Sequence, residues 1–305
     1  LLQSLARKLM RADLSSLEAA RVDRHFDGEL RKTSLPGSIT GEQIRALFVD
    51  RAALLREPIV GKIDFAHRTF QEYLAAKAVL DEDSLEELLQ RAADDQWREA
   101  IIAAAGLARP TERTKLLRSL INRGNGNVVG AARSALSNLF NKDGLDEMRT
   151  NKSYLHLLAV ACLETATSVE PQTRSYVRDC AKALMPPRDD DEVAMVVRAG
   201  NEVVSILNYE ISYSEEEASR CVDALVGIGT RDVMPLIADY AKAANGNPSM
   251  YFNGLGKAIG KGWDVFEQDV YINDLLVYVT HLDLNQTQVS DVAPLSSLSQ
   301  LQYLY

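Results

Sequence analysis

Apolar and charged side chains alternate over residues 62–65, where Ile63 and Phe65 are separated by Asp64 and preceded by Lys62. A period of two residues predicts a half-buried β-strand. Helical periodicity surrounds this strand on both sides. We expect helices over residues 2–10, 17–30, 42–50 and 69–80. Helices, a short hairpin with a turn at residues 58–61, and then a further helix predict a winged-helix module.

The helix expected over residues 69–80 carries an apolar stripe that the stem of Lys77 can join. We expect four apolar side chains of this region to lie in the core: Phe65, Phe70, Tyr73 and Leu74. The neighbouring Gln71 and Glu72 either pair with another domain or belong to a solvated helix face.

The pattern predicts a continuous succession of helices from about residue 84 to residue 280. Two capping boxes mark helix starts along the chain, at Thr40 with Gln43 and at Ser84 with Glu87. Amphipathic stretches occur near residues 97–108, 114–121, 128–140, 154–163, 173–184, 193–207, 215–228 and 233–243. Breaks rich in Gly, Pro and Asn are expected at residues 123–127, 185–187 and 245–248. The pattern predicts stacked helix pairs, an α-solenoid of the HEAT or armadillo kind.

Leucine spacing changes again near the C-terminus. Val279 and Leu301 are 22 residues apart, as are Leu282 and Leu304. This period predicts one leucine-rich repeat and the start of the next. The predicted fold is therefore mostly α, with three parts: a winged-helix module at residues 1–80, a helical-repeat domain at residues 81–270, and the beginning of leucine-rich repeats at residues 271–305.

Composition fits a globular chain of 305 residues, with 46% hydrophobic and 25% charged residues. Residues 1–120 hold 19 basic and 19 acidic side chains, whereas residues 121–305 hold 15 and 24, which makes nucleic acid an unfavourable partner for the second part. The three isolated cysteines and the lack of a long apolar run predict a cytoplasmic protein without a membrane span. The first residues resemble the interior of a helix, so we expect a longer parent chain.

Catalytic patterns are weak throughout. The string Gly254-Leu-Gly-Lys-Ala-Ile-Gly-Lys-Gly262 is the nearest match to a phosphate-binding loop, but five residues separate its outer glycines at 254 and 260, and Gly262 replaces the Ser or Thr that would bind magnesium. We expect a glycine-rich helix-packing segment or a loop there, with Lys257 and Lys261 on the surface. The histidines His25, His156 and His281 lack metal-ligand spacing, and we expect His281 to be exposed. We predict no catalytic residue and no metal site.

A longer motif covers residues 63–76, which read Ile-Asp-Phe-Ala-His-Arg-Thr-Phe-Gln-Glu-Tyr-Leu-Ala-Ala. This segment closely resembles the end of the winged-helix part of NACHT-type STAND ATPases, the bacterial NLR-like proteins. In that family an apolar strand ends in Phe-x-His, and a helix then reads Phe-Gln-Glu-aromatic-x-Ala-Ala. Together with Leu54-Leu55 and residues 95–101, the resemblance covers about residues 40–107.

The resemblance implies a cofactor-binding role for His67, which matches the family histidine that reaches the β-phosphate of bound ADP and holds the closed, inactive state. From spacing alone, His67 could instead cap local backbone. The chain lacks a Walker motif, so this fragment is expected to bind no cofactor and to have no enzymatic activity. ATP or ADP with Mg would belong to the NTPase domain of the full-length parent.

The implied function is the regulatory and sensor portion of a signal-transducing ATPase that couples ligand sensing to nucleotide-controlled oligomerisation, in bacterial relatives for antiphage defence. Expected partners are a protein ligand or phage-derived trigger, the chain's own NTPase domain, and further copies in a homo-oligomer. The alternative is a stand-alone α-solenoid scaffold that binds another protein and no nucleotide.

Overall fold

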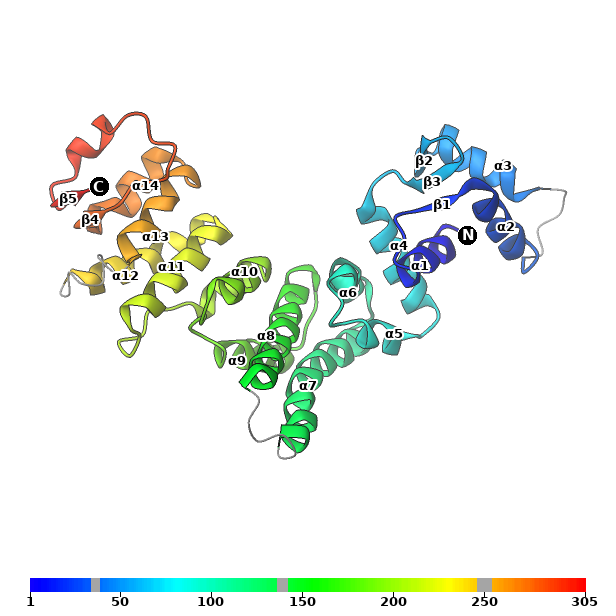
Figure 1. The fold of residues 1–305 in the computed structure, drawn as a ribbon, viewed down its shortest axis with the longest axis horizontal. Coiled ribbons are helices and arrows are strands. Elements are labelled where there is room, and N and C mark those ends of the chain that lie inside the picture. Colours follow the sequence, from blue (N-terminus) through cyan, green and yellow to red (C-terminus); the bar gives the residue numbers. More distant parts are fainter. Residues whose placement is uncertain (34–38, 136–141, 246–253) are drawn as a thin grey trace. The chain divides into compact units, whose positions relative to one another are not determined.

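The fold is mostly helical, with a few short strands (Figure 1). The computed structural model describes residues 1–33, 39–135, 142–245 and 254–305, with side chains described outside residues 127–148. The chain forms two compact units. Unit 1 contains Leu1–Leu120 and Thr165–Glu170, and unit 2 contains Ile121–Glu164 and Pro171–Tyr305.

Unit 1 begins with helices around a small antiparallel sheet. Its elements are α1 (Leu2–Arg11), β1 (Ser16–Glu18), α2 (Ala19–Leu30), α3 (Gly41–Ala46), a π-helical turn (Leu47–Arg51), β2 (Leu55–Ile59), β3 (Lys62–Phe65), α4 (Arg68–Asp81), α5 (Leu85–Gln90), a 3₁₀ turn (Asp95–Trp97), α6 (Arg98–Leu107) and the start of α7 (Pro110–Ala135). The strand order is β1-β3-β2. Residues 34–38, which connect α2 to α3, lie outside the described residues.

The central strand β3 has the bounds that its alternation predicts. Ile63 and Phe65 are buried beneath the sheet, and Lys62 is exposed. The short strand β1 was not predicted, because a three-residue strand leaves almost no periodic signal. Leu17, which we expected to begin a helix, pairs instead with Ile63, and the helix begins at Ala19.

Helix α4 faces the core differently from the prediction. Phe70 and Tyr73 were expected in the core but are 39% and 43% exposed. The buried residues of this helix are Gln71, Glu72, Ala75, Ala76, Ala78 and Val79. Small alanines let α4 pack closely on α1 and α6, its main helical neighbours, and this close packing turns the aromatic rings outward. Of the two alternatives for Gln71 and Glu72, the solvated helix face is therefore wrong.

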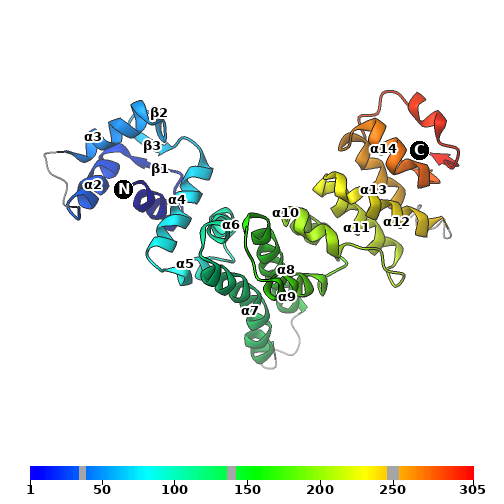
Figure 2. The ribbon, with the colours of Figure 1, turned by 180° about the vertical axis from the view of Figure 1, so that it is seen from behind.

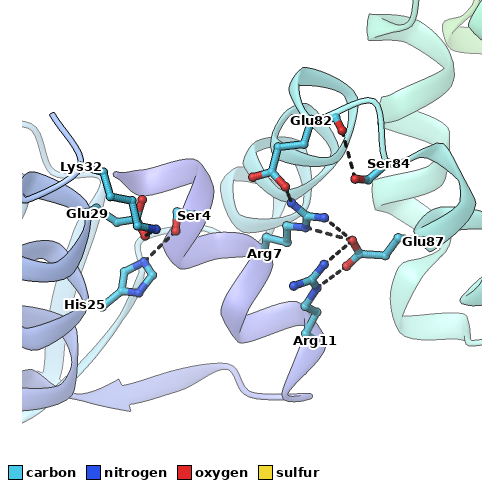
Figure 3. A network of polar contacts seen from close by, with 9 residues as sticks. All are labelled: Ser4, Arg7, Arg11, His25, Glu29, Lys32, Glu82, Ser84 and Glu87. Atoms are coloured by element: carbon cyan, nitrogen blue, oxygen red, sulfur yellow. Dashed lines mark hydrogen bonds and ion pairs between the residues drawn. The ribbon is translucent and has the colours of Figure 1, made fainter.

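An ion cluster joins α1 to the start of α5 (Figure 3). Glu87 accepts hydrogen bonds from the guanidinium groups of Arg7 and Arg11, and Arg7 also pairs with Glu82. The capping box predicted at Ser84 is therefore absent, because the Glu87 carboxylate is held by the arginines and the Ser84 hydroxyl donates to the Glu82 carbonyl. The box predicted at Thr40 is present.

Unit 2 continues the helical succession (Figure 2). After the second part of α7, its elements are α8 (Lys142–Thr165), α9 (Pro171–Lys182), α10 (Asp190–Arg198), α11 (Glu215–Ile228), α12 (Met234–Ala244), α13 (Gly256–Gly260), α14 (Gln268–Asp274), β4 (His281–Leu282) and β5 (Tyr303–Leu304), with short 3₁₀ turns between several of them. Helix α11 contacts α10, α12 and α13. This succession is consistent with an α-solenoid.

Two glycines behave differently from the prediction. The break expected at residues 123–127 is absent, because α7 runs through it. A side-chain carbon at Gly124 would lie 2.8 Å from the His156 ring, so this glycine serves close packing and not a turn. Conversely, the helix expected over residues 193–207 stops at Gly200, whose φ of 80° ends α10. Of the break predicted at residues 245–248, only Asn245 is described, and it follows the end of α12 at Ala244.

The C-terminal strands pair in parallel. His281 lies opposite Tyr303 and Leu282 opposite Leu304, so the 22-residue spacing of the leucines is also the register of the strands. The prediction of an exposed His281 was wrong: its side chain is 6% exposed and stacks on the Tyr303 ring at 4.4 Å. Four leucines of this segment are buried: Leu282, Leu284, Leu295 and Leu298.

No helix in the described ranges is both long and apolar enough to cross a membrane.

Candidate functional site

His67 occupies the corner between β3 and α4. Its backbone is extended, with φ −134° and ψ 139°, and its carbonyl accepts the first hydrogen bond of the helix, from Phe70 at 3.0 Å. The imidazole is exposed and makes no capping hydrogen bond to the helix. Its ring meets the edge of Phe70 at 5.6 Å. The alternative that His67 serves as a local backbone cap therefore lacks its hydrogen bond.

Phe65 and Arg68, near neighbours of His67 in the sequence, line a cavity of about 320 Å³ within unit 1, and His67 itself does not line it. Phe65 closes it on the apolar side, and Arg56 and Arg68 bring guanidinium groups to it. Both cations are engaged: Arg56 binds Asp64 at 2.8 and 3.1 Å, and Arg68 binds Glu72 at 2.9 Å. These ion pairs hold the Arg56 and Arg68 side chains at the cavity, whereas the nearby His67 ring contacts Phe70 and makes no capping hydrogen bond.

Burial raises the pKa of the Glu72 carboxyl, although the hydrogen bond from Arg68 acts in the opposite direction. Beside Glu72, the amide of Gln71 donates to the Leu14 carbonyl at 3.3 Å. Polar groups on the buried side of α4 thus hold the helix in place. The exposed side presents His67, Phe70 and Tyr73 together.

An exposed imidazole at such a corner has simple chemistry. It can donate one hydrogen bond when neutral and two when protonated, so it suits an oxyanion such as a phosphate. Among the described residues no nucleophile and base lie together at His67. The described part of the chain also holds no cluster of His, Cys, Asp or Glu that could bind a metal ion.

The glycine-rich string at residues 254–262 is part of a packed helix. A side-chain carbon at Gly260 would lie 1.7 Å from the Asp283 carbonyl oxygen, and one at Gly262 would lie 2.6 Å from the Tyr271 hydroxyl. Lys257 and Lys261 are exposed, and Lys261 pairs with Asp223 at 2.5 Å. Of the two alternatives expected for this segment, the structure shows the helix-packing one.

The remaining histidines contact neighbouring helices. His25 shares a hydrogen bond of 3.1 Å with Ser4, and the buried His156 lies 3.3 Å from the carbonyls of both Ile121 and Cys180. The three cysteines form no disulfide, and burial raises the pKa of the Cys221 thiol to about 11.

A second concave feature of unit 1 was missed by the sequence analysis. A groove of about 550 Å³ lies between α1 and α2, and we call it the basic groove because Lys8, Arg21, Arg24 and Lys32 line it. Part of the signal was present, because Arg21 and Arg24 are three residues apart on α2 and Lys32 follows two residues after the end of this helix. It was obscured by the equal number of acidic residues in the same part of the chain.

Comparison with known proteins adds no relative: no protein-family model, no curated protein and no solved structure matches this chain.

Proposed function

We propose that this chain is the regulatory and sensor portion of a NACHT-type signal-transducing ATPase. In this proposal unit 1 contains a winged-helix module that responds to the nucleotide held by the chain's own NTPase domain. The helical repeats and the C-terminal strands meet a protein ligand, such as a phage-derived trigger, and its binding releases the molecule to form a homo-oligomer. The chain itself has no enzymatic activity; ATP or ADP with Mg belongs to the parent's NTPase domain.

The observation that carries the proposal is the exposed His67 ring, which stands without a capping bond where β3 passes into α4. The resemblance assigns the phosphate-contacting histidine to this same corner. His67 is exposed at the start of α4, whereas its neighbour Arg68 pairs with Glu72 and Phe65 is buried. An exposed imidazole in this position suits a contact with a group from outside unit 1.

The order of elements supports the winged-helix part. Unit 1 runs helix, strand, two helices and a hairpin, and its sheet order is β1-β3-β2. The sensor part is supported by the parallel pairing of β4 with β5 at a 22-residue register, which suits the start of a leucine-rich array.

The test uses the full-length parent protein, including its NTPase domain. His67→Ala should speed the dissociation of a fluorescent ADP analogue by about ten- to a hundredfold, because one charge-assisted hydrogen bond to phosphate contributes roughly 1.5–3 kcal/mol. Size-exclusion chromatography with light scattering should show a shift toward the oligomer. Thr69→Ala, an exposed neighbour on the first turn of α4, is the matched control and should release ADP at the parental rate.

Unchanged ADP release and unchanged oligomerisation in His67→Ala would refute the role of His67. A parent gene that encodes no phosphate-binding loop would refute the larger proposal and favour the scaffold alternative.

A further inference from the structure

The basic groove between α1 and α2 combines an apolar floor with a cationic rim. Leu9 and Leu17 are buried at its base, and Leu14 is 41% exposed beside them. The side chains of Lys8, Arg21, Arg24 and Lys32 are exposed around it. The hydrogen bond between Ser4 and His25 ties the two helices together at the groove (Figure 3).

Cations elsewhere on unit 1 are mostly neutralised by the fold. Arg7 and Arg11 bind Glu87, Arg45 binds Asp23, and Arg56 binds Asp64. In the basic groove the situation is reversed. Lys32 pairs with Glu29 at 2.7 Å, but no carboxylate in the described ranges pairs with Lys8, Arg21 or Arg24. Glu29, which also lines the groove, therefore offsets Lys32, and the charges of Lys8, Arg21 and Arg24 are left without a carboxylate partner among the described residues.

The field of these cations acts on the histidine in the groove. Burial lowers the pKa of His25, and the positive charge of Lys8 lowers it further, whereas Glu29 acts to raise it. A neutral His25 keeps its hydrogen bond with Ser4 and adds no charge to a groove that is already cationic.

Gly28 lies in the last turn of α2 and lines the groove. A glycine inside a helix weakens it, and the usual structural reason is a close neighbour. Here a side-chain carbon would meet no atom within 4 Å, so packing does not require the glycine. Its effect is to leave open the stretch of groove between Arg24 and Lys32, where any larger residue would project into the space.

We propose that the basic groove binds an acidic segment of a partner protein that also carries apolar side chains. The apolar side chains would cover Leu9, Leu14 and Leu17, and the carboxylates would meet Arg21 and Arg24 along the rim. An apolar floor favours such a segment over a phosphate backbone, which offers charge but no apolar group to cover the leucines. The inference does not depend on the nucleotide role of His67.

The test measures fluorescence polarisation of a labelled synthetic peptide in which two leucines are flanked by glutamates. The whole chain should bind it saturably, and added salt should weaken the binding because the rim charges are exposed. Replacing its glutamates by glutamine, or its leucines by serine, should each weaken binding. Arg21→Glu combined with Arg24→Glu should raise the Kd by about tenfold or more.

Gly28→Leu is the second variant, since it should block the groove without disturbing the fold. Leucine is the better helix former, so circular dichroism should show a melting temperature equal to or above that of the parent chain. Arg31→Glu, an exposed arginine at the end of α2 that does not line the groove, is the matched charge control and should bind the peptide as the parent does.

Absence of saturable peptide binding would overturn the proposal, as would unchanged binding in Gly28→Leu and in the Arg21 and Arg24 double variant. Equal binding of the serine-containing peptide, or tighter binding of double-stranded DNA at the same ionic strength, would instead make the groove a general anion site. Loss of peptide binding in both groove variants, with Arg31→Glu unaffected, would support it.

Discussion

Glu87→Gln should destabilise unit 1 more than any ordinary surface substitution. The Glu87 carboxylate accepts hydrogen bonds from Arg7 at 2.9 and 2.6 Å and from Arg11, and glutamine can replace it with only one oxygen. The Arg7 side chain is 9% exposed, so its charge would keep only Glu82 as a carboxylate partner. A partly buried charge that loses its main partner costs about 2–4 kcal/mol of unfolding free energy.

The two tryptophans allow unit 1 to be followed alone. Trp97 belongs to unit 1 and Trp263 to unit 2, and both are buried. In a Trp263→Phe background, Trp97 fluorescence during urea unfolding reports on the unit that contains Glu87. Linear extrapolation to zero urea then yields the unfolding free energies of parent and variant. Glu86→Gln, an exposed glutamate on the same helix, is the control and should change the free energy by about 0.5 kcal/mol or less.

The effect has a defined pH dependence. Burial acts to raise the pKa of Glu87, but the hydrogen bonds from Arg11 and Arg7 outweigh it and hold the pKa below the ordinary value of 4.5. A carboxyl with a lowered pKa stabilises the folded state above its unfolded pKa, and this contribution is lost as the pH falls through its folded pKa. The difference between parent and Glu87→Gln should therefore be full at pH 7 and shrink below about pH 4.5.

Equal unfolding free energies for parent and Glu87→Gln at pH 7 would refute the stabilising role of the cluster. A difference that stayed constant from pH 7 to strongly acidic pH would assign the loss to packing and not to charge.

Two further substitutions and one exchange measurement test the packing of the chain. Gly260→Ala should destabilise unit 2 by about 3 kcal/mol, because the new carbon would lie 1.7 Å from a carbonyl oxygen; Trp263 fluorescence in a Trp97→Phe background measures it. Arg113→Met should lower the free energy of unfolding of unit 1 by about 3–5 kcal/mol, because the buried guanidinium donates to four carbonyls and methionine donates to none. Trp97 fluorescence measures this change, and an unfolding free energy equal to that of the parent would contradict it. Amide hydrogens of residues 301–305 should exchange much faster than those of α11, and equal protection would show a finished cap.

Local patterns predicted the strand β3 and most helices because each depends on nearby residues. Lys62 to Phe65 alternate so clearly that their strand has the expected bounds, and the box at Thr40 forms because Gln43 has no competing partner. At Ser84 the same pattern failed, since arginines far away in the sequence bind Glu87. A capping box is a local signal, and a stronger long-range ion pair can override it.

The side of α4 that faces the core could not be predicted from hydrophobicity. Phe70 and Tyr73 have the larger apolar surfaces, yet Ala75 and Ala76 are buried because α1 and α6 approach closely there. His67 was identified by resemblance alone, and periodicity contains nothing about it. The basic groove needed the structure, because the sequence shows cations but not whether carboxylates neutralise them.

The pairing of β4 with β5 restricts how the C-terminal segment can vary in length. Neighbouring residues of a strand point to opposite sides, so a one-residue deletion within residues 283–302 would bring Leu304 opposite His281 in place of Tyr303. The stacked rings of His281 and Tyr303 would be lost, and Leu304 would no longer lie opposite Leu282. Replacement of an exposed side chain leaves the register of β4 and β5 unchanged. Natural variants should therefore differ in residue type within this segment and keep its length constant. Insertions should be accepted only as whole units of 22 residues.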